Sequence, residues 1–139
     1  MKKLNLGCGY HYTQGWTNLD FKSAGPDVIA WDLRKGIPFP DNNFDVVYHS
    51  HLLEHLAKNE AEKFMYDCFR VLSPGGILRV VVPDLECITR WYLHALELCL
   101  QGSKEWVPNY QWIMLEMYDQ AVRNKSGGDM KKHLIENHG

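Results

Sequence analysis

Two glycines and an acid near the start of the chain have a spacing that can support ligand chemistry. The apolar run at residues 4–6 stops at Gly7-Cys8-Gly9, and a second short run stops at Asp20. If both runs are parallel strands, the glycine loop and the carboxylate lie together at the carboxyl edge of the sheet, where open α/β sheets bind ligands. Glycine lets backbone amides approach a ligand closely, and a carboxylate accepts two hydrogen bonds from a ribose diol. The spacing therefore predicts a nucleoside site.

The same stretch argues against a dinucleotide such as NAD. A dinucleotide site has G-x-G-x-x-G opening a helix, with an acid about 20 residues further on. Here Tyr12 stands where the third glycine would be, and Asp20 follows Gly9 by 11 residues. Since at most a turn or two of helix fits between the two runs, the amides and dipole that hold a pyrophosphate are poorly supplied. A ligand with a ribose and no phosphates fits better, and the alternative is an ordinary tight turn.

Composition sets the broad class of the protein. A chain of 139 residues with 45% hydrophobic and 23% charged residues has room for one globular domain with a real core. The formal net charge is −2 and no dense Lys/Arg cluster occurs, so no nucleic-acid partner is predicted. No apolar run is long enough for a membrane span, no signal-peptide pattern follows Lys2-Lys3, and no C-x-x-C pair occurs. We expect a cytoplasmic protein.

The elements that would position these residues alternate between strands and helices. Beyond the first two strands we expect a third strand at residues 27–33 that again ends at an acid, Asp32, then strands at 44–50 and 77–82. Asn59 and Glu62 are spaced as the N-cap and N3 residues of a capping box, which predicts the start of a helix that ends at residues 73–76. We expect two further helices, one from Leu85 and one after Pro108. The pattern predicts an α/β fold, a Rossmann-like, open and mostly parallel sheet of about five strands flanked by helices.

Six segments, in order, resemble the class I S-adenosylmethionine-dependent methyltransferases, and more narrowly their compact type-11 branch. They are Leu4-Asn5-Leu6-Gly7-Cys8-Gly9, Asn18-Leu19-Asp20, Trp31-Asp32-Leu33, residues 39–47, His51-Leu52-Leu53-Glu54-His55-Leu56 and residues 70–76. On this resemblance, residues 1–139 are a single methyltransferase-like domain, with a nucleoside-binding core at 4–84 and a helical segment at 85–139. The sixth and seventh strands of the family fold are not found in the sequence.

The resemblance implies a site for S-adenosylmethionine at the carboxyl edge. The backbone around Gly7 and Gly9 would meet the methionine end of this donor, and Asp20 would bind the ribose hydroxyls. Further along, the segment after the third strand would bracket the adenine and bond its exocyclic amine, and the end of the fourth strand would line the floor beneath the sulfonium. The implied cofactor-binding residues are Leu6, Gly7, Cys8, Gly9, Asp20, Asp32, Leu33, Ser50 and His51. As an alternative, Asp20 and Asp32 each simply cap a helix or turn.

A cluster of histidines follows the fourth strand and has several interpretations. His51, Glu54 and His55 stand at i, i+3 and i+4, so they share one face if the segment is helical. Their spacing matches the H-x-x-E-H of inverzincin metalloproteases. A metal-dependent hydrolase is therefore an alternative function, although we favour it less. A bound metal that orients an acceptor hydroxyl, and plain hydrogen-bonded helix-start residues, are two others. His133 and His138 could complete a metal site, although we predict none.

We favour His51 as a general base for the methyl acceptor, with His49 behind it on the same side of the sheet. The predicted function is methyl transfer from S-adenosylmethionine to an unidentified small-molecule, glycan or lipid-precursor acceptor. The main alternative is a methyltransferase-like domain that binds the nucleoside or a partner without catalysis. An unpaired edge beside the fifth strand would favour a homodimer.

Overall fold

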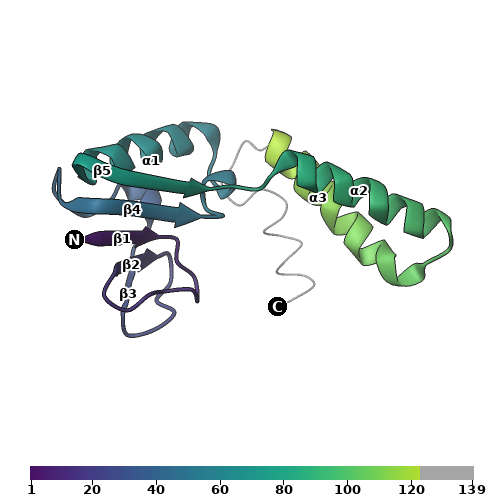
Figure 1. The fold of residues 1–139 in the computed structure, drawn as a ribbon, viewed down its shortest axis with the longest axis horizontal. Helices are drawn as coiled ribbons and strands as arrows, with labels where there is room; N and C mark the ends of the chain where they lie inside the picture. The colour runs from purple at the N-terminus through teal and green to yellow at the C-terminus, as the bar shows by residue number, and fades with distance from the viewer. Residues whose placement is uncertain (123–139) are drawn as a thin grey trace. The chain divides into compact units, whose positions relative to one another are not determined.

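The computed structural model describes residues 1–122 of the chain (Figure 1). The chain divides into two compact units, Met1–Val82 and Pro83–Gly139. This division lies two residues before the predicted boundary between the nucleoside-binding core and the helical segment.

The first unit is built on a five-stranded, all-parallel sheet with strand order β3-β2-β1-β4-β5 (Figure 1). The predicted fold class is thereby confirmed. The order reverses between β1 and β4, and in open α/β sheets the carboxyl edge beside such a reversal is where ligands bind. The strands are β1 (Lys3–Leu6), β2 (Thr17–Asp20), β3 (Val28–Ala30), β4 (Phe44–Ser50) and β5 (Leu72–Val81).

A single long helix of this unit, α1 (Lys58–Val71), packs on β5 and, through Phe64, on His49 of β4. Its buried residues Phe64, Cys68 and Val71 join the inward side chains of the central strands, such as Leu6 and Val47, in one hydrophobic core. Central parallel strands are covered in this way and therefore read as apolar runs. The core fixes the strands whose ends form the candidate site.

The helix begins two residues earlier than predicted. Ala57 is the N-cap, and the Glu60 carboxylate accepts a hydrogen bond from the Ala57 backbone N–H at 3.2 Å. The prediction of Asn59 and Glu62 as the capping pair was wrong, because a glutamate two residues earlier, Glu60, already accepts the equivalent hydrogen bond from the N-cap amide. The short η2 helix (Leu53–His55) precedes it.

The fifth strand is longer than predicted, since β5 already begins at Leu72. Its pairing with β4 jumps from Leu72 opposite Phe44 to Ile77 opposite Val46. Residues 73–76 are the extra chain at this irregularity, and Gly75 has a φ of 78° that suits glycine. The Pro-Gly-Gly sequence that predicts the end of the helix therefore makes a bulge within the strand.

The second unit is a helical hairpin as far as the structure describes it. It comprises α2 (Leu85–Leu100), η3 (Lys104–Trp106) and α3 (Val107–Val122), which confirms helices in both predicted places. Asp84 caps α2 by accepting hydrogen bonds from the Glu86 and Cys87 amides at 2.9 and 3.2 Å. The Tyr92 and Tyr110 rings stack between the two long helices, 5.6 Å apart. Within residues 1–122, none of the helices has the length and hydropathy that crossing a membrane requires.

Candidate functional site

The glycine loop folds back onto the end of β2. Gly7 and Gly9 have φ angles of 65° and 53°, which suit glycine, and the Gly7 amide donates to the Leu19 carbonyl at 2.8 Å. The Gly9 amide donates to Oδ2 of Asp20 at 2.8 Å. No helix lies between β1 and β2. The structure thus brings together the loop and the carboxylate that the sequence places at neighbouring strand ends.

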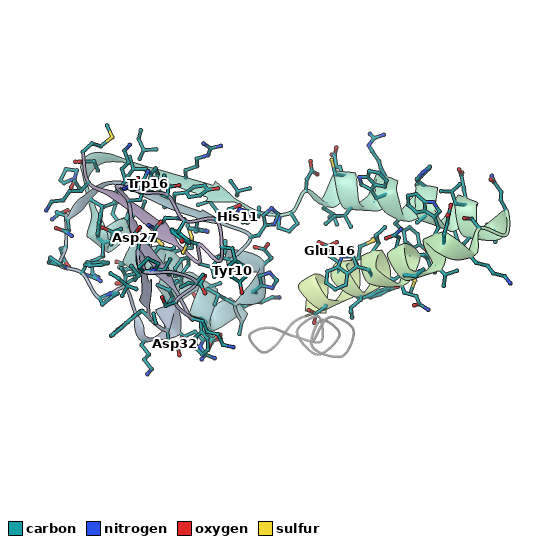
Figure 2. The ribbon with its side chains drawn as sticks, turned by 90° about the horizontal axis from the view of Figure 1, so that it is seen from below. Tyr10, His11, Trp16, Asp27, Asp32 and Glu116 are labelled. Atoms are coloured by element: carbon teal, nitrogen blue, oxygen red, sulfur yellow. The ribbon has the colours of Figure 1, made fainter. Side chains whose placement is uncertain are left out.

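The two glycines have different surroundings. A Cβ at Gly7 would lie 2.9 Å from Cδ1 of Leu52, whereas a Cβ at Gly9 would meet no atom within 4 Å. The Gly7 side of the loop therefore packs against the segment after β4, and the Gly9 side is open. The neighbouring Tyr10 is exposed on the same loop, which Figure 2 shows at the edge where the strands end.

The Asp20 carboxylate has room for a ligand. Its Oδ2 accepts from Gly9, and its Oδ1 accepts from the Lys22 amide at 3.3 Å. An ionised carboxylate has about four acceptor positions, so capacity remains for a ribose diol. This half-buried acid, the open space at Gly9 and the short loop without a helix fit an adenosine-type cofactor.

Two other predicted residues of this loop have buried side chains. Leu6 belongs to the core and Cys8 is almost fully buried. Burial, and then the nearby Asp20 charge, raise the pKa of the Cys8 thiol. Cys8 is therefore a neutral thiol that donates weakly to the Gly9 carbonyl at 3.7 Å, and only the backbone of these residues can meet a ligand.

Asp32 lies in a different environment from that of Asp20. The strand predicted over residues 27–33 ends at Ala30, and Asp32 caps the η1 helix (Leu33–Lys35), accepting from the Arg34 amide at 3.1 Å. Its two oxygens also accept from Nε and Nη2 of Arg34, each at 2.8 Å. This side-chain hydrogen bond is the main cause that lowers the pKa of Asp32. The prediction of an acid at the end of the third strand was wrong, because aspartate readily bonds the backbone two residues further on.

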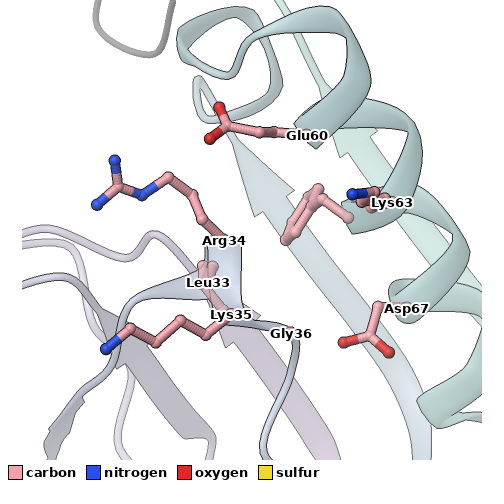
Figure 3. Close-up of a pocket in the computed structure, with 8 residues that line it drawn as sticks. Leu33, Arg34, Lys35, Gly36, Glu60, Lys63 and Asp67 are labelled. Carbon is pink, nitrogen blue, oxygen red and sulfur yellow. The ribbon is translucent and has the colours of Figure 1, made fainter.

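Leu33 and a cavity lie beside this turn. The Leu33 side chain belongs to the core, so a ligand at this point would meet its backbone. A cavity of about 280 Å³ separates η1 from α1 (Figure 3). Arg34 and Lys35 line it from η1, and the α1 side contributes Glu60, Lys63, Phe64 and Asp67. The cavity adjoins the segment that the resemblance assigns to adenine.

The end of β4 carries the predicted base. His51 follows the last strand residue, Ser50, in a left-handed backbone conformation with a φ of 51°. Its amide donates to the Val81 carbonyl at 3.0 Å, and its Nδ1 lies 3.1 Å from Oε1 of Glu54. The His51 side chain is 62% exposed and that of Glu54 is 8% exposed. An exposed imidazole is therefore held against a buried carboxylate.

The two histidines of this segment do not share an environment. His49 is fully buried, its ring lies 5.1 Å from that of Phe64, and neither ring nitrogen has a hydrogen-bond partner among the described residues. Burial lowers the pKa of His49 to about 4. His51 has left the strand alternation through its positive φ, so the assumption that places both on one side fails. A catalytic role for His49 stays a prediction that this geometry disfavours.

The three residues His51, Glu54 and His55 do not form one helical face. His51 precedes the η2 helix, which covers only Leu53–His55. Within residues 1–122, no group of three His, Cys, Asp or Glu side chains is placed to hold a metal ion. His133 and His138 lie outside the described residues.

Comparison with known proteins connects this geometry to a family. Residues 12–80 match the family described as "Methyltransferase domain". These residues belong to the class I S-adenosylmethionine-dependent methyltransferases. The cofactor of that family is S-adenosylmethionine. The methyltransferase match includes Asp20, Asp32, Ser50 and His51, and the glycine loop ends three residues before it begins.

Two curated relatives match part of this chain. A Mycolicibacterium smegmatis protein named "Probable S-adenosylmethionine-dependent methyltransferase" is 40% identical over 57 residues, 38% of this chain and 21% of that protein. An Aspergillus luteorubrus protein named "Probable methyltransferase ltbC" is 36% identical over 58 residues, 39% of this chain and 20% of that protein. The matched part thus spans about a fifth of each relative. A solved structure named "DhpI-SAM-HEP complex" matches with a TM-score of 0.47 and 20% identity, covering 75% of this chain and 53% of that one.

Two contacts of the candidate site were not predicted from the sequence. Leu52 packs against Gly7, and Glu54 holds the His51 ring. The i, i+3 spacing of His51 and Glu54 was a signal for the second contact. No pattern in the sequence pointed to the first, because it joins residues from two distant loops.

Proposed function

We propose that this chain contributes the donor-binding core of an S-adenosylmethionine-dependent methyltransferase. The observation that carries this proposal is the hydrogen bond between the Gly9 amide and the Asp20 carboxylate, with open space beside Gly9. When bound, S-adenosylmethionine supplies an electrophilic methyl group attached to a positively charged sulfur. Alignment and desolvation are then the main tasks of the protein.

In this proposal each strand end has one task. The backbone of the Gly7–Gly9 loop holds the methionine end, and Asp20 accepts hydrogen bonds from the ribose hydroxyls. The backbone at Leu33 meets the adenine, since Arg34 already occupies the Asp32 carboxylate. Ser50 and His51, at the end of β4, would line the floor beneath the sulfonium of the donor. His51, whose side chain is 62% exposed, removes a proton from the substrate that receives the methyl group.

The acceptor in this proposal is a small molecule, or a glycan or lipid precursor. No single-sign charge field supports a nucleic acid, since the net charge is −2. We also propose that the protein acts in the cytoplasm.

A homodimer through β5 completes the proposal for partners. This strand pairs only with β4 among the described residues, and the exposed side chains along it include Ile77 and Val80. An exposed apolar edge strand of this kind readily pairs with another chain. Sedimentation velocity of the wild type and of Val80→Lys tests this, and dimerisation predicts that only the wild type sediments as a dimer.

A thermal-shift experiment tests the donor site directly. The wild-type chain is heated alone and with S-adenosylmethionine, S-adenosylhomocysteine, NAD or Zn²⁺. A ligand at 100 times its Kd stabilises the folded state by about 2.7 kcal/mol. We expect stabilisation by the two sulfur nucleosides and none by NAD. Stabilisation by NAD alone, or by Zn²⁺ alone, would overturn the proposal in favour of a dinucleotide or metal enzyme.

A further inference from the structure

Glu54 is a buried carboxylate that contacts a histidine on the surface. Its side chain is 8% exposed, yet Oε1 lies 3.1 Å from Nδ1 of His51, whose side chain is 62% exposed. A carboxylate that only closed a surface turn would gain more by facing water, because burying a charge is unfavourable unless hydrogen bonds compensate it. The arrangement is that of a group that orients a ring.

The backbone around His51 is fixed from both sides. The His51 amide donates to the Val81 carbonyl of β5, and the residue adopts a φ of 51°, which is uncommon for residues other than glycine. Strained conformations of this kind persist where the surrounding structure imposes them, and they cluster at functional sites. The next residue, Leu52, packs against Gly7. This contact holds the His51 segment next to the glycine loop.

The chemistry of the pair decides which ring nitrogen is basic. An ionised carboxylate only accepts hydrogen bonds, so the Nδ1 that faces Glu54 must carry the hydrogen. In a neutral imidazole the other nitrogen, Nε2, then has the free lone pair.

We propose that Glu54 is a positioning residue that holds His51 as its Nδ1–H tautomer, so that Nε2 deprotonates a hydroxyl acceptor. This inference rests on the proposed methyltransferase function and narrows its substrate class. The acceptor O–H bond breaks, its proton binds to Nε2, and the electron pair stays on oxygen. The oxygen forms a bond to the donor methyl carbon as the C–S bond breaks and its electron pair leaves with sulfur. His51 then releases the proton to solvent.

The test reads the tautomer without needing the acceptor. Long-range ¹H–¹⁵N spectra distinguish a protonated ring nitrogen from a bare one, and His51→Asn assigns the His51 signals. The wild type is compared with Glu54→Gln, whose amide can donate to Nδ1. The matched control is Glu62→Gln, which removes the same charge from an exposed position on α1. The spectra are recorded at a pH where the ring is neutral by its own shifts.

We expect the Nδ1–H form in the wild type and in Glu62→Gln, and a shift toward the Nε2–H form in Glu54→Gln. An Nε2–H form in the wild type, or an unchanged tautomer in Glu54→Gln, would overturn the proposal. If Glu54→Gln fails to fold, wild-type spectra alone still decide, since only the Nδ1–H form is compatible with it.

Calorimetric titration of the folded variants with S-adenosylhomocysteine separates this proposal from the donor site. A positioning role for Glu54 leaves that affinity within about twofold of the wild type, because Asp20 and the glycine loop carry it; a tenfold loss would show that Glu54 shapes the donor site instead. Absence of binding to the wild type would contradict the proposed function, whereas the tautomer result would stand by itself.

Discussion

Polar side chains have different environments at the carboxyl edge of the sheet and on the face that α1 covers. At the edge, three such side chains each have a hydrogen-bond partner: Asp20 pairs with the Gly9 amide, Asp32 with Arg34, and His51 with Glu54. On the covered face His49 is fully buried beside Phe64, without a hydrogen-bond partner for either ring nitrogen among the described residues. The edge is organised by polar contacts that a ligand can join or replace. The covered face is organised by packing, and its burial of His49 favours the neutral imidazole.

The largest expected effect comes from the covered face, in its response to acid. The pKa of His49 falls from 6.5 to about 4 on folding, so the unfolded state binds more protons between these values. The contribution of the neutral His49 ring to the free energy of unfolding is fully present above pH 6.5 and is lost as the pH falls toward 4. The difference is about 3 kcal/mol. In His49→Leu this part of the pH dependence disappears.

Urea denaturation of both proteins at pH 7 and pH 5 measures the change, with the exposed His11→Ala as control. Equal loss of unfolding free energy between the two pH values in wild type and His49→Leu would show that the covered face does not carry the acid response.

At the edge, Asp20→Ala should weaken S-adenosylhomocysteine binding most. It removes the ribose acceptor and the partner of the Gly9 amide, and hydrogen bonds to a charged group contribute about 1.5–3 kcal/mol. We expect about a 10- to 100-fold rise in Kd by calorimetric titration. An unchanged Kd would mean that the edge beside β2 is not the donor site.

Alanine substitutions at Gly7 and Gly9 compare the packed side of the loop with its open side. Both have positive φ, so alanine at either position costs about 1–2 kcal/mol of backbone energy. Gly7→Ala additionally forces Leu52 to move, because its Cβ would lie 2.9 Å from Cδ1, whereas Gly9→Ala meets open space. We therefore expect a larger loss of unfolding free energy for Gly7→Ala in urea denaturation. The opposite order would contradict the packing of Leu52 on the loop.

Asp32→Ala should have the smallest effect of these substitutions. It removes a surface pair with Arg34 and one helix cap, each worth about 1 kcal/mol or less of stability. Since that carboxylate is already occupied, the Kd for S-adenosylhomocysteine should change less than about threefold. A loss as large as that in Asp20→Ala would place Asp32 in the donor site and end the distinction between the two acids.

The fold of the first unit was largely predictable from the sequence. The bounds of β4 match the predicted 44–50, and β2 ends at Asp20 as expected. These predictions succeeded because apolar runs, glycines and prolines act over a few residues. The errors, at Asp32 and at the start of α1, arose where a side chain accepts a hydrogen bond from a nearby backbone amide. Asp32 accepts from the Arg34 amide, and Glu60 accepts from the Ala57 amide.

The position of the candidate site was predictable from the sequence, whereas the surroundings of its side chains were less so. The juxtaposition of the glycine loop with Asp20 followed from strand ends that meet at one edge. The different surroundings of His49 and His51 did not, because alternation along a strand cannot anticipate the positive φ at His51.

By itself the sequence determined where the chain extends, turns and coils, and hence which residues reach the carboxyl edge. The tertiary structure alone decided which of them remain open to a ligand. Arg34 occupies one acid, Leu52 seals one side of the loop, and α1 buries one histidine. Local patterns report backbone preference and burial, whereas the partner of a polar group depends on side chains brought together by packing.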